Sequence, residues 1–147
     1  MQGGSVSIIR HALVLALAGG LLAACAPSAG TSETGVTVQV DGGSYTDISP
    51  AQLAEMLESE DFFFVNTHVP YEGEIEPTDA FIPYDETAQR LADFPADKAA
   101  KIVVYCRSDR MSGITAQELV RAGYTNVWNL DGGMVAWEQA GYPLIQK

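Results

Sequence analysis

The residues best suited to chemistry lie in the segment CRSDRMS, which runs from Cys106 to Ser112. A β-branched apolar run precedes this segment, and a stretch with helical periodicity follows it. A cysteine sulfur is a nucleophile only as a thiolate, so a reactive cysteine needs surroundings that favour the anion. The unpaired N–H groups of a helix start and the side chains of Arg107 and Arg110 would supply them. The segment therefore suits a reactive thiolate, an anionic ligand, or both. Alternatively, the arginines are solvated or pair with Asp109 and Glu118.

A targeting signal is expected at the start of the chain. The uncharged apolar run ALVLALAGGLL follows a single arginine and leads into LAAC, which ends at Cys25. This order is typical of a secretory signal, and the run is shorter than the roughly 20 residues that span a membrane. The string LLAAC resembles the bacterial lipobox, whose cysteine becomes the lipidated first residue of the mature chain. We predict a lipoprotein signal peptide at residues 1–24, lipid on Cys25, and an extracytoplasmic, membrane-anchored protein of the bacterial cell envelope. A plain signal-peptidase site and an uncleaved anchor are the alternatives.

The cysteine count bears on the reactivity of Cys106. The chain has two cysteines, and lipid on Cys25 would leave Cys106 without an intrachain disulfide partner. An unpaired thiol outside the cytoplasm is a candidate reactive group. The alternative is a buried structural cysteine that packs as a small hydrophobic residue. We expect residues 25–43 to form the lipidated N-terminus and a flexible tether, and residues 44–147 to form the folded domain.

The patterning predicts strands that alternate with helices. Apolar runs at 62–66, 101–106 and 126–130 predict buried strands, and residues 36–48 predict a hairpin around Asp41. Helices are expected from Ser49 as N-cap through residue 59, at 86–94, at 111–124 with Gly123 as C-cap, and at 132–141. This alternation predicts an α/β fold with a mostly parallel sheet and helices on both faces.

A second segment is expected beside Cys106. In such a sheet, ligands bind outside the carboxyl ends of the strands. Cys106 ends one predicted strand and Asn66 ends another, so Asn66 and His68 are candidates for the wall of a shared pocket. Removal of the signal would leave His68 as the one histidine of the chain. His68 either pairs with Cys106 or hydrogen-bonds within the long connection that follows Asn66.

The loop and the tail together resemble a single-domain rhodanese, a sulfurtransferase. The tail VWNLDGGMVAWEQAGYP meets the pattern L-x-G-G-x-x-x-W-x-x-x-G-x-P through Leu130, Gly132, Gly133, Trp137, Gly141 and Pro143. The resemblance covers roughly residues 44–144. It implies a rhodanese-like α/β domain with a central, mostly parallel, five-stranded sheet. It also implies that Cys106 takes a sulfane sulfur from a thiosulfate-type donor as a persulfide and passes it to a thiol or cyanide acceptor.

The resemblance also implies the site. The backbone amides of the loop would hold the cysteine sulfur and the substrate, and the loop residues are Arg107, Ser108, Asp109, Arg110, Met111 and Ser112. Arg107 or Arg110 would bind the anionic donor, and no cofactor or metal is implied. Asp109 stands where many rhodaneses have glycine. Aspartate tolerates a left-handed backbone better than most residues, but its charge would repel an anionic donor.

Other functions fit the residues less well. A phosphatase or arsenate reductase of this loop type needs arginine at the sixth position after the cysteine, where Ser112 stands here. A non-catalytic rhodanese fold that binds a partner or senses redox state is the main alternative. The net charge of −11 argues against general nucleic-acid binding. The acidic residues at 72–79 match no cation-binding loop and predict a solvated surface. We expect a monomer whose partners are a small sulfur donor, a thiol acceptor and the membrane.

Overall fold

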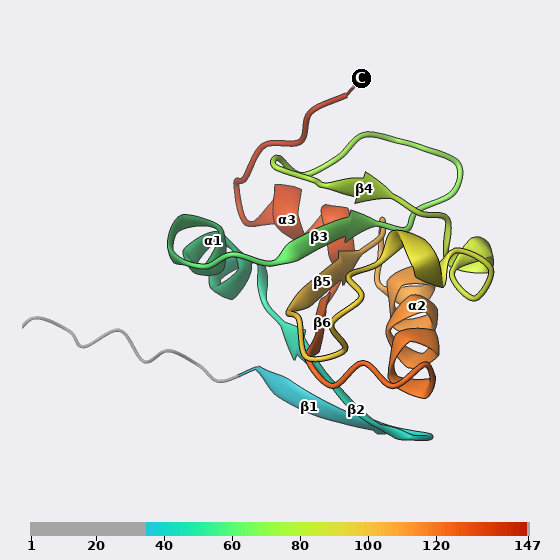
Figure 1. Cartoon of the computed structure of the whole chain (residues 1–147). Helices are drawn as coiled ribbons and strands as arrows, with labels where there is room; N and C mark the ends of the chain where they lie inside the picture. The colour runs from blue at the N-terminus through green and yellow to red at the C-terminus, as the bar shows by residue number, and fades with distance from the viewer. Residues whose placement is uncertain (1–34, 147) are drawn as a thin grey trace, which may run out of the picture. The chain divides into compact units, whose positions relative to one another are not determined.

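The computed structural model describes residues 35–146, which form a mixed sheet with helices on both faces (Figure 1). The sheet has six strands in the order β1-β2-β6-β5-β3-β4. Only the β1–β2 pair is antiparallel. The strands are β1 (Val36–Val40), β2 (Gly43–Ile48), β3 (Phe63–Asn66), β4 (Ala80–Phe81), β5 (Ile102–Tyr105) and β6 (Val127–Leu130). The predicted α/β class and mostly parallel sheet are confirmed, but the sheet has six strands, where five were expected.

Three α-helices cover the sheet, and each face has its own core. The helices are α1 (Pro50–Ser59), α2 (Arg110–Arg121) and α3 (Gly133–Gln139). Helix α2 packs Ala116, Leu119 and Val120 against one face of the sheet. Helices α1 and α3 pack on the other face, through Leu53 and Met56 and through Met134 and Trp137. Burial of both faces explains why β3 and β5 read as continuous apolar runs.

Helix α1 begins where the sequence predicts. The Ser49 hydroxyl accepts a hydrogen bond from the Gln52 backbone, and the Gln52 side chain accepts one from the Ser49 backbone. Pro50 occupies the first helical turn, where its missing N–H group leaves no acceptor unsatisfied. This reciprocal capping box fixes the direction in which the chain leaves β2.

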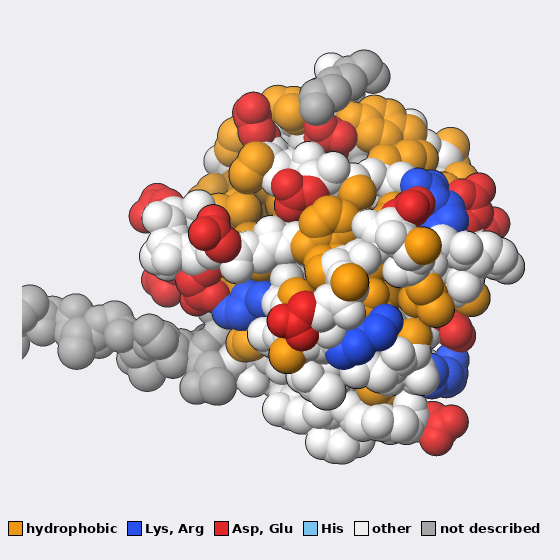
Figure 2. Space-filling model, in the orientation of Figure 1, with side chains coloured by type: hydrophobic (Ala, Val, Ile, Leu, Met, Phe, Trp, Pro, Cys, Tyr) orange, Lys and Arg blue, Asp and Glu red, His pale blue; other side chains and the backbone are white. Residues whose placement is uncertain are grey.

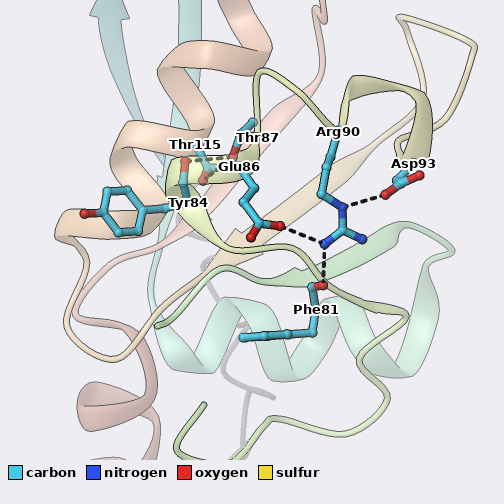
Figure 3. A network of polar contacts seen from close by, with 7 residues as sticks. All are labelled: Phe81, Tyr84, Glu86, Thr87, Arg90, Asp93 and Thr115. Carbon is cyan, nitrogen blue, oxygen red and sulfur yellow. Dashed lines mark hydrogen bonds and ion pairs between the residues drawn. The ribbon is translucent and has the colours of Figure 1, made fainter. Parts of the chain in front are cut away.

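The helix expected at residues 86–94 is wrong. Two short 3₁₀ turns, Tyr84–Glu86 and Leu91–Asp93, occupy this region. Figure 3 shows the contacts made there instead: Arg90 donates to the carboxylates of Glu86 and Asp93 and to the carbonyl of Phe81. The Thr87 hydroxyl also lies 3.1 Å from that of Thr115 on α2. These contacts hold the segment as a compact connection packed on α2.

The hairpin expected at 36–48 is present, with Gly42 and Gly43 at its turn. Its first strand, β1, lies inside the range 25–43 that was assigned to the tether, so residues 36–40 belong to the sheet. The predicted signal peptide at 1–24 and the predicted lipidation site Cys25 lie outside the described residues. No helix within residues 35–146 has the length and hydropathy needed to cross a membrane.

Charged side chains are dispersed over the face of the molecule seen in Figure 2. Lys and Arg side chains form separate groups there, and Asp and Glu side chains lie near several of them. Ion pairs on the surface include those of Arg90 with Asp93, Arg121 with Glu118, and Lys101 with Glu60. Glu118 is thus taken by Arg121, and not by an arginine of the loop.

Candidate functional site

Cys106 lies at the carboxyl end of β5, between that central strand and α2. Its side chain is 1% exposed, and it is a free cysteine. The next strand, β3, ends at the same edge of the sheet, since Asn66 lies opposite Tyr105 in the parallel register. Thr67 joins the two ends, because its N–H and its hydroxyl both donate to the Tyr105 carbonyl, at 2.8 and 3.0 Å. The sulfur is therefore held at the sheet edge where parallel α/β folds bind ligands.

The loop that follows Cys106 presents its backbone N–H groups without protein partners. Within the described residues, no protein acceptor takes a hydrogen bond from the N–H groups of residues 107–112. Helix α2 starts at Arg110, so part of this set is its unpaired first turn. Successive free amides in a tight loop form a concavity that stabilises an anion. The buried Ser112 hydroxyl lies 3.4 Å from the Cys106 sulfur, and its one hydrogen is shared between that sulfur and the Asp109 carbonyl.

The first residues of α3 hold the loop through backbone hydrogen bonds to its carbonyl groups. The N–H of Met134 donates to the Cys106 carbonyl at 2.9 Å, and that of Val135 donates to the Arg107 carbonyl at 3.0 Å. Gly133 allows this approach, because a Cβ atom there would lie 2.3 Å from the Cys106 carbonyl oxygen. The tail motif thus serves to position the loop. Trp137 anchors α3 by packing in the core and donating to the Pro143 carbonyl.

Arg107 extends from the loop into a pocket of about 450 Å³. Its Nε atom lies 2.7 Å from Oε2 of Glu72, and the two side chains are 55% and 46% exposed. The pocket lies beside α3 and is lined by Tyr71, Glu72, Gly73, Arg107, Met134, Val135, Glu138, Leu144 and Gln146. Arg107 is the one cation in this lining, and its charge is offset by the Glu72 carboxylate from the long connection.

Arg110 points elsewhere. Its guanidinium carbon lies 5.9 Å from the centre of the Tyr84 ring, a cation–π contact with the segment before α2. The two arginines of the loop therefore separate, with Arg107 near α3 and Arg110 near the 3₁₀ turn at Tyr84–Glu86. Ser108 is exposed, and Met111 is half-buried on the first turn of α2.

Asn66 and His68 lie in the connection that follows β3. Asn66 organises the backbone there: its amide donates to the Gly73 carbonyl at 2.9 Å and its Oδ1 accepts from the His68 N–H at 3.0 Å. The His68 ring is 7% exposed, and its Nε2 lies 3.4 Å from Oε2 of Glu72. Among the described residues, neither ring nitrogen of His68 has a hydrogen-bond partner, so neither of the two roles considered for His68 is shown.

Three of the four acidic residues at 72–79 are exposed, as expected (Glu72, Glu76 and Asp79), and Glu74 is the exception. Glu74 is buried and accepts a hydrogen bond from the Tyr71 hydroxyl, and Asp79 accepts one from the Phe64 N–H at 2.8 Å. Glu72 pairs with Arg107. Within residues 35–146, no group of three or more His, Cys, Asp or Glu side chains could hold a metal ion.

Asp109 turns its carboxylate toward the sheet. Its Oδ1 accepts a hydrogen bond of 2.7 Å from the amide nitrogen of Asn129, which is fully buried on β6. The same nitrogen donates to Oδ1 of Asp47 on β2, also at 2.7 Å. Burial and the nearby carboxylates of Asp109 and Asp131 raise the pKa of Asp47, against the lowering effect of the Asn129 hydrogen bond. Sequence reasoning missed Asn129 and Asp47. A polar residue inside the buried strand VWNL was the available signal, because such a residue needs a partner.

Residues 49–140 match the family model of the rhodanese-like domain, and this chain belongs to that family. A protein named sulfurtransferase from Allochromatium vinosum is 32% identical over 67% of this chain and 94% of its own length. The thiosulfate sulfurtransferase GlpE of Actinobacillus pleuropneumoniae serotype 7 is 31% identical over 69% of this chain and 94% of its own. An uncharacterised Synechocystis protein is 33% identical over 67% of this chain, but the match spans about half (55%) of that relative. The two relatives named as sulfurtransferases support a sulfurtransferase-type function.

The fold agrees with solved rhodanese structures. A rhodanese-related protein from Thermoplasma volcanium aligns with a TM-score of 0.59 at 24% identity, over 69% of this chain and 98% of that one. At this identity the likeness concerns the fold alone. It is consistent with the sheet order and the helical layers described above.

Proposed function

We propose that this protein is a rhodanese-type sulfurtransferase that carries a sulfane sulfur on Cys106. The observation that carries the proposal is the position of the Cys106 sulfur at the base of a loop whose N–H groups, at residues 107–112, have no acceptor among the described residues. Such a loop stabilises a thiolate and then the negative terminal sulfur of a persulfide. The names of the similar sulfurtransferases support the same chemistry.

The transfer needs no cofactor. The Cys106 thiolate attacks the outer sulfur of thiosulfate, a new sulfur–sulfur bond forms, and the bond to the inner sulfur breaks. Sulfite leaves with the electron pair of that bond. The acceptor, a thiolate or cyanide, then attacks the outer sulfur of the persulfide. The acceptor leaves with the sulfur, as a persulfide or as thiocyanate, and Cys106 regains its thiolate. Arg107 attracts the anionic donor, and the loop amides hold the reacting sulfur.

Intact mass spectrometry tests this proposal. Incubation with thiosulfate should add the mass of one sulfur atom, cyanide should remove it, and Cys106→Ser should remain unmodified in both steps. Ser59→Ala is the matched control, because the Ser59 hydroxyl lies on α1 and contacts only the Glu55 carbonyl. If the wild-type chain takes up no sulfur from thiosulfate or from an organic persulfide, the protein is a binding or sensing domain instead.

We also propose that the mature protein is tethered to a bacterial membrane through lipid on Cys25. The lipobox-like LLAAC and the preceding apolar run support this location. Lipid chains would place the domain at the membrane surface on the far side from the cytoplasm. Expression of the full chain in a bacterium, followed by fractionation and intact mass, would test it: the membrane-bound chain should lack residues 1–24 and carry lipid on Cys25. A membrane-bound chain whose Cys25 carries no lipid would contradict the lipid anchor.

A further inference from the structure

Asp109 adopts a backbone conformation that its residue type resists. Among residues 35–146, it is the one non-glycine residue with positive φ, at φ +91° and ψ −45°. The position lies between Cys106 and the first turn of α2, where the loop reverses direction. A non-glycine residue holds such a conformation only when its surroundings stabilise it. The contacts of Asp109 should therefore show what shapes the loop.

The Asn129 amide supplies the stabilising contact. Its nitrogen donates one hydrogen bond to Asp109 and one to Asp47, each 2.7 Å long, so both amide hydrogens are used. Asn129 is 0% exposed and lies directly opposite Asp47 in the parallel β2–β6 register. The amide is thus fixed to the centre of the sheet, and it holds the Asp109 carboxylate from a rigid base.

The contact continues from Asp109 to the nucleophile. The Asp109 carbonyl accepts hydrogen bonds from the Gly113 N–H and from the Ser112 hydroxyl, each 2.9 Å long. The Ser112 hydroxyl in turn lies 3.4 Å from the Cys106 sulfur. A rotation of the Asp109 peptide unit would therefore move the serine that faces the sulfur. A released carboxylate would also add negative charge close to an anionic donor.

We propose that Asn129 is a positioning residue for sulfur transfer. Its amide holds Asp109 in the left-handed conformation that shapes the Cys106 loop, and it keeps the Asp109 charge directed at the sheet. The inference rests on the proposed sulfurtransferase function. It also explains how the chain keeps an aspartate at this position in the loop.

A double-mutant cycle between Asn129 and Asp109 tests the proposal. Asn129→Ala should lower kcat/KM for thiosulfate about tenfold, the factor expected for the loss of one charge-assisted hydrogen bond. Most of the loss should lie in the KM for thiosulfate, with little change in the KM for an uncharged thiol acceptor such as dithiothreitol. Asp109→Gly should raise kcat/KM, because glycine adopts positive φ without help and carries no charge. In the Asp109→Gly background, Asn129→Ala should then change kcat/KM by less than about twofold.

Two controls separate positioning from general stability. Asn129→Leu keeps a side chain of four heavy atoms branched at Cγ in the buried strand but removes the amide, so it should match Asn129→Ala in activity. Asn126→Ala removes an amide that contacts only the Ala99 carbonyl and the Trp128 ring nitrogen, and it should leave kcat/KM unchanged. Thermal unfolding of each variant would show that the compared chains are folded.

Different results would refute the role of Asn129 and the sulfurtransferase function. Suppose that the wild-type chain transfers sulfur, but that Asn129→Ala and Asn129→Leu lower kcat/KM by the same factor with and without the Asp109→Gly substitution. Asn129 then acts only on stability, and the proposal is wrong. Wild-type kinetics in both folded Asn129 variants would overturn it as well. A wild-type chain that takes up no sulfur would instead contradict the sulfurtransferase function.

Discussion

Arg107 and Glu72 form an ion pair at the mouth of the Cys106 loop, with 2.7 Å between Nε and Oε2. The same carboxylate oxygen lies 3.4 Å from Nε2 of the buried His68. Glu72 therefore neutralises the Arg107 guanidinium, and it connects the loop to the chain after β3. Under the proposed function, Arg107 attracts the anionic donor, so this pair would weaken donor binding.

Replacement of Glu72 should strengthen donor binding. In Glu72→Gln, the Arg107 guanidinium loses its carboxylate partner and is free to meet thiosulfate. Exposed ion pairs contribute only about 0.2–1 kcal/mol, so we expect a KM for thiosulfate that is about two- to threefold lower. Steady-state kinetics at low salt would measure it, and the difference should shrink as ionic strength rises. Glu118→Gln, which removes an exposed carboxylate paired with Arg121, is the matched control. An unchanged or higher KM in Glu72→Gln would mean that Arg107 does not bind the donor.

Removal of the Ser112 hydroxyl should slow the reactions of Cys106. The single hydrogen of this hydroxyl is shared between the Cys106 sulfur, at 3.4 Å, and the Asp109 carbonyl, at 2.9 Å. In Ser112→Ala, the thiolate loses this hydrogen bond, and we expect about fivefold slower persulfide formation, as for one hydrogen bond of about 1 kcal/mol. Alkylation by iodoacetamide at fixed pH should slow in the same direction. Alkylation and sulfur uptake at the wild-type rates would show that the loop amides alone stabilise the anion.

Asp47 should make the folded protein more stable as the pH falls. Burial raises the pKa of Asp47 in the folded state, so folding favours its protonated form. The pKa of Asp47 in the unfolded chain is about 3.9. At pH values between this pKa and the raised pKa of the folded state, the folded protein binds more protons than the unfolded chain. This contribution to the free energy of unfolding falls as pH rises through that window and stays unfavourable above it. Asp47→Asn keeps an oxygen acceptor for Asn129, and it should raise the free energy of unfolding at neutral pH. Urea unfolding at neutral pH and at a pH below the unfolded pKa would test this, because the difference should vanish at the lower pH.

Much of the fold could be predicted because its signals are local. The apolar runs that became β3 and β5, and the capping residues Ser49 and Pro50, depend on neighbours within a few positions. The two-residue strand β4 gave no pattern, since Ala80 and Phe81 pair only because β3 lies beside them. The expected helix at 86–94 failed for a similar reason. Arg90 has tertiary hydrogen-bond partners there that a periodic pattern does not contain.

The site divides in the same way. A cysteine at a strand end before a helix is a local feature, so the position of Cys106 at the ligand-binding edge followed from the sequence. The side chains that contact the loop come from distant parts of the sequence. Asn129, which donates to Asp109, lies 20 positions after it, and Glu72, which pairs with Arg107, lies before strands β4 and β5. The charge of Asp109 was expected to repel a donor. In the structure, the buried Asn129 amide donates to this carboxylate. The carboxylate is thereby directed at the sheet, so its repulsion of a donor at the loop should be weaker than expected.

Alanine substitutions at two glycines with positive φ, Gly123 and Gly133, should distinguish the cost of backbone strain from the loss of support for the Cys106 loop. Gly133 has φ +57°, and a Cβ there would lie 2.3 Å from the Cys106 carbonyl oxygen and 2.8 Å from the Arg107 carbonyl carbon. Gly123 has φ +91°, but a Cβ there would meet nothing within 4 Å. Gly123→Ala should lower the free energy of unfolding by about 1–2 kcal/mol, from strain alone, and leave sulfur uptake intact. Gly133→Ala should lower the free energy of unfolding by more than about 3 kcal/mol, because the overlap of the new Cβ with the Cys106 carbonyl oxygen forces α3 away from the loop. Urea unfolding would measure both losses. Any Gly133→Ala protein that folds should form the persulfide more slowly than Gly123→Ala, and equal rates would mean that α3 does not support the Cys106 loop.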